Sequence, residues 1–118
     1  MDVCSVGERL VKITMAGRLD APGVDRVESR FVASVVPQPN NAILDLSRVE
    51  FVSSLGIRML ISAARALRAR QSMLVVYGAP ASVADVFRSV SLQKIVPICA
   101  TEGEALAAIA FWSRAAGV

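Results

Sequence analysis

The stretch DLSRVEFVSSLGIRM, residues 45–59, joins a buried strand to a helix, and the other elements can be placed around it. The residues just before it carry no charge, and the run predicts a central strand over residues 42–46. Apolar residues then recur at helical spacing and predict a helix over residues 54–69. Ser54 stands at the change of period, where a serine hydroxyl can cap the free N–H groups of a first helical turn. Gly56 allows either backbone or a partner to come close.

Strand and helix patterns alternate along the rest of the sequence, with turn residues between them. A strand, a helix and a second apolar strand in succession predict a parallel, right-handed crossover. We therefore expect an α/β fold in a single domain spanning residues 1–118, with a mixed sheet of about four to five strands and about four helices packed against it. The other expected elements are an antiparallel hairpin over residues 3–18, a helix over residues 21–36 capped by Asp20, a strand at residues 72–77, a short helix at residues 81–90, an edge strand at residues 92–98 and a last helix capped by Thr101.

Composition argues against several classes of function. Apolar residues make up 54% of the sequence, but no run reaches the roughly 18 to 20 unbroken apolar residues that cross a bilayer. We therefore expect a cytoplasmic protein without membrane insertion. The formal charge of +3 and the few aromatic residues argue against direct nucleic-acid binding. Cys4 and Cys99 have neither metal-ligand nor redox spacing, so we expect buried, reduced thiols and no metal or other cofactor.

The sequence contains no histidine, which removes the usual general base of a serine nucleophile. A Ser-His-Asp triad is therefore impossible. Val52 also stands where a G-x-S-x-G turn would need its first glycine. We expect no catalytic residues and a binding function rather than an enzyme, and hydrolysis by Ser54 is disfavoured.

Ser54 is a candidate phosphoacceptor. A phosphate added at a helix N-terminus lies beside unpaired N–H donors and the positive end of the helix dipole. Projection at about 100° per residue places Arg58, Arg65 and Arg68 on the same side of the helix as Ser54. This basic ridge is either a solvated face or a surface for partner recognition. Arg58, one turn after Ser54, could approach a phosphate or a partner carboxylate.

The segment DLSRVEFVSSLGIRML resembles the STAS domain of anti-sigma factor antagonists, as do the GRLD turn at residues 17–20 and EGEAL at residues 102–106. The likeness spans nearly the whole chain. In that family a serine between the strand and the helix is phosphorylated by an anti-sigma factor kinase, and the resemblance gives Ser54 that position. The G-x-L-D turn lies near this serine in the family and contributes to the partner surface. With the helical projection, the resemblance indicates six partner-binding residues: Asp20, Ser53, Ser54, Leu55, Gly56 and Arg58.

The resemblance implies an anti-sigma factor antagonist, a phosphoprotein that regulates transcription. Its implied partner is an anti-sigma factor with a histidine-kinase-like ATPase domain. Ser53 stands where the family usually has aspartate, and Leu55 where it usually has serine or threonine. These departures favour somewhat the alternative, a non-phosphorylated scaffold subunit of a stressosome-like or lipid-transport assembly in which Ser54 only caps the helix. The sequence does not indicate the oligomeric state.

Overall fold

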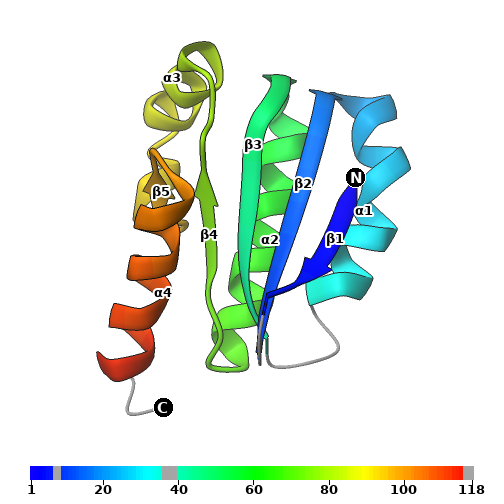
Figure 1. The fold of residues 1–118 in the computed structure, drawn as a ribbon. Coiled ribbons are helices and arrows are strands. Elements are labelled where there is room, and N and C mark those ends of the chain that lie inside the picture. The colour runs from blue at the N-terminus through cyan, green and yellow to red at the C-terminus, as the bar shows by residue number, and fades with distance from the viewer. Residues whose placement is uncertain (7–8, 36–39, 116–118) are drawn as a thin grey trace.

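The computed structural model describes residues 1–6, 9–35 and 40–115. Within these ranges the chain forms a five-stranded sheet in the order β1-β2-β3-β4-β5 and four α-helices, which confirms the predicted α/β fold (Figure 1). The strands are β1 (Asp2–Ser5), β2 (Leu10–Leu19), β3 (Asn41–Val52), β4 (Leu74–Tyr77) and β5 (Ile98–Cys99). The helices are α1 (Ala21–Val35), α2 (Ser54–Ala69), α3 (Ala81–Ser89) and α4 (Glu102–Ala115), and a 3₁₀ turn, η1, spans Leu92–Lys94.

The sheet is mixed. β1 pairs antiparallel with β2, as the predicted hairpin requires, and β2 to β5 pair in parallel. Parallel strands end at the same edge of a sheet, so the helices that follow them begin at that edge. This carboxyl edge lies at the ends of β2, β3 and β4 and carries the starts of α1, α2 and α3. It is the upper edge of the sheet in Figure 1.

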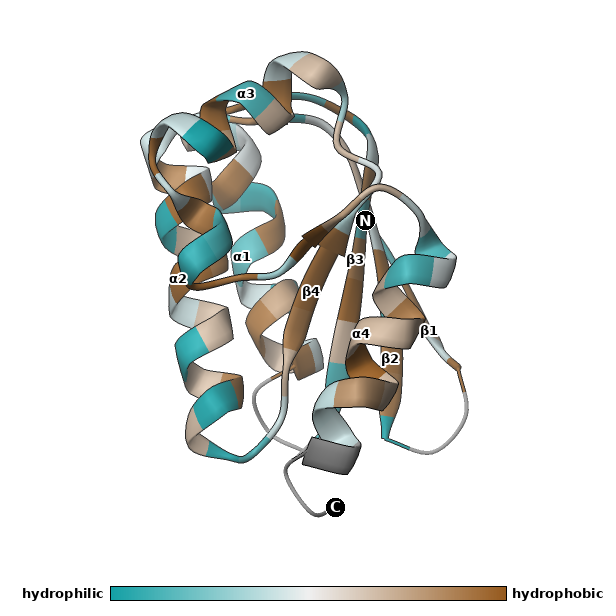
Figure 2. Ribbon diagram, turned by 90° about the vertical axis from the view of Figure 1, so that its left-hand side faces the viewer, coloured by the Kyte–Doolittle hydropathy of each residue, from teal (hydrophilic) through white to brown (hydrophobic). Residues whose placement is uncertain are grey.

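Helices cover both faces of the central strands, which accounts for the apolar runs of β3 and β4. Residues of α1, α2 and α3, among them Phe31, Leu60 and Phe87, belong to the larger buried cluster with residues of β2 to β4. α4 packs over the other face against β3, β4 and β5, in a second cluster that includes Val75 and Ile109 (Figure 2). The sheet therefore separates two cores.

A polar cluster ties the start of α4 to the sheet. Lys12 Nζ lies 2.8 Å from Glu102 Oε1, and the Tyr77 hydroxyl donates to the same oxygen at 3.3 Å. The hydrogen bond to Glu102 raises the pKa of Lys12, and burial raises the pKa of Tyr77. Thr101 caps the helix as predicted, because its Oγ1 accepts from the Glu104 N–H at 3.2 Å. The helix thus begins at a defined point over β2 and β4.

Two strands differ from the prediction. β3 continues to Val52 instead of ending at residue 46, because the end of β2 keeps pairing with it. Residues 92–98 do not form the predicted edge strand. They begin with η1, and only the short β5 that follows pairs with β4. Leu92 and Val96 lie in the core, and the N–H groups of Ile95 and Val96 both donate to the Leu92 carbonyl at 2.9 Å, so the segment turns instead of extending as a strand.

The two cysteines are free, but they are not both buried as predicted. Cys4 is exposed, because all residues of β1 lie exposed at the edge of the sheet. Cys99 is half-buried in β5, and burial raises the pKa of its thiol. Within the ranges that the structure describes, no helix combines the length and the apolar character needed to cross a membrane.

Candidate functional site

The start of α2 is capped by Ser53, one residue earlier than predicted. Ser53 has an extended backbone (φ −90°, ψ 176°), and its Oγ accepts from the Gly56 N–H at 3.4 Å. A capping residue needs a non-helical backbone, whereas Ser54 is already the first residue of the helix. The prediction that Ser54 caps the helix is therefore wrong, and the two adjacent serines have different structural roles.

Ser53 also joins α2 to the end of β2. Its Oγ donates to the Leu19 carbonyl oxygen at 2.9 Å, and its backbone N–H donates to the same oxygen at 3.0 Å. This pair of hydrogen bonds connects residues 34 positions apart in the sequence. Sequence reasoning missed the contact, because no local pattern relates the end of one strand to the cap of a distant helix. The cap is thus held by tertiary as well as local hydrogen bonds.

Gly56 lets the first turn of α2 lie directly against β2. A Cβ added at this position would lie 2.9 Å from the Leu19 carbonyl oxygen and 2.9 Å from Val52 Cγ1. Both distances are shorter than Cβ atoms normally make. Of the two explanations that the sequence leaves open for this glycine, the close approach of backbone is the one seen here. Gly56 is buried, so it positions the exposed residues beside it.

Three of the predicted partner-binding residues, Ser54, Leu55 and Arg58, are exposed at the start of α2. Leu55 is 42% exposed, an unusual position for a large apolar side chain. The Ser54 hydroxyl has no hydrogen bond to any described residue. Because Ser53 already provides the cap, the Ser54 hydroxyl is available to another molecule. It lies beside the positive end of the helix dipole.

Asp20 lies at the neighbouring helix start, where its carboxylate already has partners. Oδ1 accepts from the Gly23 N–H at 3.1 Å, which caps α1 as predicted, and Oδ2 lies 3.2 Å from Arg18 Nε. The Gly23 N–H, followed by Arg18, holds the pKa of Asp20 below its usual value. Asp20 follows Leu19 directly and therefore belongs to the same edge as Ser53. In the described part of the chain no hydrogen bond joins these two side chains.

Phe51 is an exposed apolar residue at this edge that sequence analysis missed. Its side chain is 38% exposed, and the Arg18 guanidinium carbon lies 4.3 Å from the centre of its ring, within cation–π range. The sequence carries no period-two signal for it, because β3 loses its alternation here: Glu50 and Phe51 are both exposed between the buried Val49 and Val52. Phe51 and Leu55 therefore flank the two serines with apolar surface.

The basic ridge predicted along α2 is exposed at Arg58, Arg65 and Arg68. Within the described ranges none of these three arginines has a salt bridge. The helix therefore presents unpaired positive charge on the side that carries Ser54. No group of three potential metal ligands occurs in the part of the chain that the structure describes.

Known proteins share both the sequence pattern and the fold. A model of the STAS domain matches residues 5–105. The anti-sigma-B factor antagonist of Listeria monocytogenes is 30% identical over 94 residues, which span 80% of this chain and 82% of that protein. The anti-sigma factor antagonist SpoIIAA, solved in its unphosphorylated form, superimposes with a TM-score of 0.74 at 22% identity and covers 99% of this chain and 96% of its own.

The STAS domain of a SulP transporter from Vibrio cholerae has the same fold, with a TM-score of 0.70 at 21% identity over 94% of this chain and 88% of its own. The fold alone therefore does not separate antagonists from transporter domains. The sequence relatives do make this distinction, because they are antagonists that match over most of their length. The chain belongs to the STAS domain family, among the anti-sigma factor antagonists.

Proposed function

We propose that this protein binds an anti-sigma factor that has a histidine-kinase-like ATPase domain, and that phosphorylation of Ser54 switches this binding. The observation that carries the proposal is the division of roles between the two serines. Ser53 makes the cap and the bonds to Leu19, while the neighbouring Ser54 hydroxyl is exposed and has no partner among the described residues. A kinase could therefore modify Ser54 without removing a hydrogen bond that holds the fold.

The start of α2 is electrostatically suited to a phosphate. A phosphoserine carries roughly 1.5 to 2 negative charges and three acceptor oxygens, and the first turn of a helix supplies free N–H groups and partial positive charge. Arg58 follows one turn later and is exposed and without a salt bridge among the described residues. The modification would thus leave α2 folded and change the charge of its surface.

The partner surface that we propose is the exposed carboxyl edge around Ser54. Leu55 and Phe51 would contribute apolar contacts, and Arg58 would meet an acidic group. The other expected binding residues act mainly through position: Ser53 and Gly56 hold α2 against Leu19, and Asp20 fixes the start of α1. Capture of the anti-sigma factor at this surface in the cytoplasm would free a sigma factor for transcription.

Phosphorylation can be tested on the intact protein. Incubation with its anti-sigma factor kinase and ATP should add one phosphate by mass, and Ser54→Ala should abolish the addition. Ser62→Ala is the matched control, because Ser62 is another exposed serine of α2. The control should be labelled like the parent protein. Continued labelling of Ser54→Ala would rule out Ser54 as the acceptor.

The effect of a negative charge at position 54 on binding of the anti-sigma factor can be tested without phosphorylation. Ser54→Asp should weaken capture of the anti-sigma factor by about tenfold or more, since loss of about 1.4 kcal/mol has that effect. An acid in the first turn suits the helix dipole, so α2 should stay folded. Ser62→Asp adds the same charge two turns later and should bind like the parent. Equal affinity of Ser54→Asp and Ser62→Asp would contradict a charge switch at this edge.

The fold, which the STAS domain of a SulP transporter shares, is equally compatible with one alternative, a scaffold subunit that is never phosphorylated. Ser53 supports it as well, because it provides a neutral cap where the family usually carries an acid. Identification of the protein captured from native cells distinguishes the two functions. A histidine-kinase-like ATPase supports the switch, whereas a transporter subunit supports the scaffold.

A further inference from the structure

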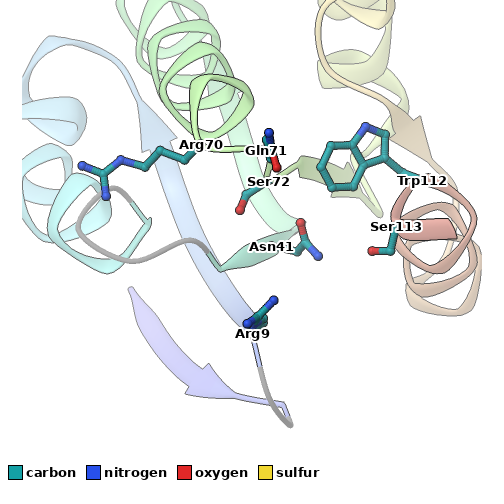
Figure 3. Close-up of a pocket in the computed structure, with 7 residues that line it drawn as sticks. All are labelled: Arg9, Asn41, Arg70, Gln71, Ser72, Trp112 and Ser113. Carbon is teal, nitrogen blue, oxygen red and sulfur yellow. The ribbon is translucent and has the colours of Figure 1, made fainter. Parts of the chain in front are cut away.

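A cavity of about 140 Å³ lies at the opposite end of α2 from Ser54. It is bounded by the loop after α2, the starts of β2 and β3, and the end of α4 (Figure 3). The carboxyl edge, where we propose that the anti-sigma factor binds, contributes no residue to it. Any ligand of this cavity would therefore concern a function beyond the one proposed above.

The turn that ends α2 gives the cavity a defined wall. Gln71 adopts the left-handed conformation (φ 60°), and its N–H donates to the Arg68 carbonyl at 3.0 Å. The Ser72 N–H reaches back to the Leu67 carbonyl at 2.8 Å. This pair of bonds is a Schellman motif, which fixes the direction of the chain and satisfies the last carbonyls of the helix. The Ser72 side chain is thus placed by a rigid turn.

Ser72 places a hydroxyl in the wall of the cavity. It is only 2% exposed, yet its hydroxyl has no hydrogen bond to any described residue. Figure 3 shows its oxygen directed into the space between the loop and Asn41. Among the described residues no buried side-chain nitrogen or oxygen lacks a hydrogen-bond partner, so the Ser72 oxygen is accessible from the cavity that it lines. The hydroxyl can therefore hydrogen-bond either water or a ligand in the cavity.

The cavity offers hydrogen-bond donors and positive charge. Asn41 Oδ1 already accepts from the Met73 N–H at 2.9 Å, which leaves its NH₂ group to donate. Arg9 and Arg70 line the cavity, and neither has a salt bridge within the described ranges. The Arg70 guanidinium is turned toward α1 in Figure 3, whereas Arg9 lies beside Asn41. No described residue that lines the cavity is acidic, so this environment favours an anion.

Trp112 provides a flat apolar wall opposite these donors (Figure 3). Its ring suits a planar ligand, because aromatic rings pack well in offset or edge-to-face arrangements. The volume of about 140 Å³ is sufficient for one aromatic ring, since a cavity of about 150 Å³ accommodates benzene. We propose that this cavity binds a small aromatic anion, with its ring against Trp112 and its carboxylate or phosphate held by Arg9, Ser72 and the Asn41 NH₂ group.

Trp112 is the only tryptophan of the sequence, so its fluorescence reports directly on the cavity. Benzoate and phenyl phosphate are the probes, and they distinguish a carboxylate from a phosphate source of the anion. At least one should change the fluorescence in a saturable way, with half-saturation at about 1 mM or below. Arg9→Gln should weaken that binding about tenfold, because it removes a charged hydrogen bond. Ser72→Ala, which removes only the hydroxyl, should weaken it by about threefold or more.

Arg65→Gln is the matched control, since it removes an exposed arginine of α2 that does not line the cavity. Its affinity should equal that of the parent. Cyclohexanecarboxylate and inorganic phosphate separate the ring from the charge, and both should bind more weakly than the aromatic probes. The proposal fails if neither aromatic probe saturates, if Arg65→Gln loses as much affinity as Arg9→Gln, or if Ser72→Ala binds unchanged. Phosphate transfer to Ser54 in Arg9→Gln should be unaffected, because the two sites lie at opposite ends of α2.

Discussion

The two ends of α2 are built in opposite ways. At its start, Ser53 and Gly56 bring the helix onto the Leu19 carbonyl and leave no room for a methyl group. At its end, the left-handed Gln71 turns the chain away and leaves a cavity beside Ser72. One helix can therefore hold an exposed hydroxyl on a rigid backbone at one end and keep space for a ligand at the other. Close backbone contact leaves no space for a ligand at the start of α2, whereas the turn at Gln71 borders a cavity at its end.

The largest change in stability should come from adding a methyl group at the closely packed start of α2. Gly56→Ala places a methyl group 2.9 Å from the Leu19 carbonyl oxygen and from Val52 Cγ1, so backbone must move. We expect a loss of about 1 to 3 kcal/mol in the free energy of unfolding, as overpacking typically costs. Urea unfolding followed by circular dichroism measures it.

Gly103→Ala is the control for Gly56→Ala. A Cβ at Gly103, in the first turn of α4, would have only Thr101 Oγ1 nearby, at 3.9 Å. This substitution should raise the free energy of unfolding by about 0.4 to 1 kcal/mol, because it restricts the unfolded chain without a clash. If Gly56→Ala were equally stabilising, the start of α2 would not be closely packed against β2.

The next effect should separate the two serines. Ser53→Ala removes the cap to Gly56 and the hydroxyl bond to Leu19, and should lower the free energy of unfolding by about 1 to 2 kcal/mol. Ser54→Ala should change it by less than about 0.5 kcal/mol, as is usual for an exposed side chain. Equal losses in the same urea experiment would show that Ser54 shares the structural role, and would weaken its assignment as a free phosphoacceptor.

The smallest change in stability should appear at the end of α2 that borders the cavity. Gln71 has a left-handed backbone (φ 60°), which costs a residue with a side chain about 1 to 2 kcal/mol. Gln71→Gly relieves that cost but adds freedom to the unfolded chain, so we expect a net gain of about 0.5 kcal/mol. Gln71→Ala keeps the strain and should show no gain. A loss of stability in Gln71→Gly would mean that its side chain, rather than the turn, holds the end of α2.

The sequence predicted the order and type of most elements, because each has its own apolar period. The predicted helix over residues 54–69 coincides with α2 (Ser54–Ala69), because its apolar residues keep a helical period throughout, although Ser53 and not Ser54 caps it. The edge strand predicted over residues 92–98 was wrong, since a short apolar run does not distinguish a strand from a turn that packs into the core. The predicted strand over residues 42–46 was too short, because the end of β3 is defined by its pairing with β2.

The candidate site was predictable where it depends on neighbours in sequence. Ser54 and Arg58 are four positions apart, so their common exposure on one side of α2 follows from their spacing, whereas Leu55 was indicated by the resemblance to STAS domains. The bonds from Ser53 to Leu19 were not predictable, because the two residues are 34 positions apart. A pattern of period two or 3.6 carries no information about which distant carbonyl a cap will meet.

The sequence by itself determined the α/β layers, the place of α2 after β3, the lack of a histidine base and the likeness to STAS domains. These depend on residue type and local spacing. Only the tertiary structure decided which serine caps α2, why position 56 must be glycine, and that Arg9, Ser72 and Trp112 surround one cavity. The physical reason is that packing the helices on a twisted sheet brings distant backbone groups into contact. Those contacts determine which polar side chains already have hydrogen bonds within the fold and which remain available for binding.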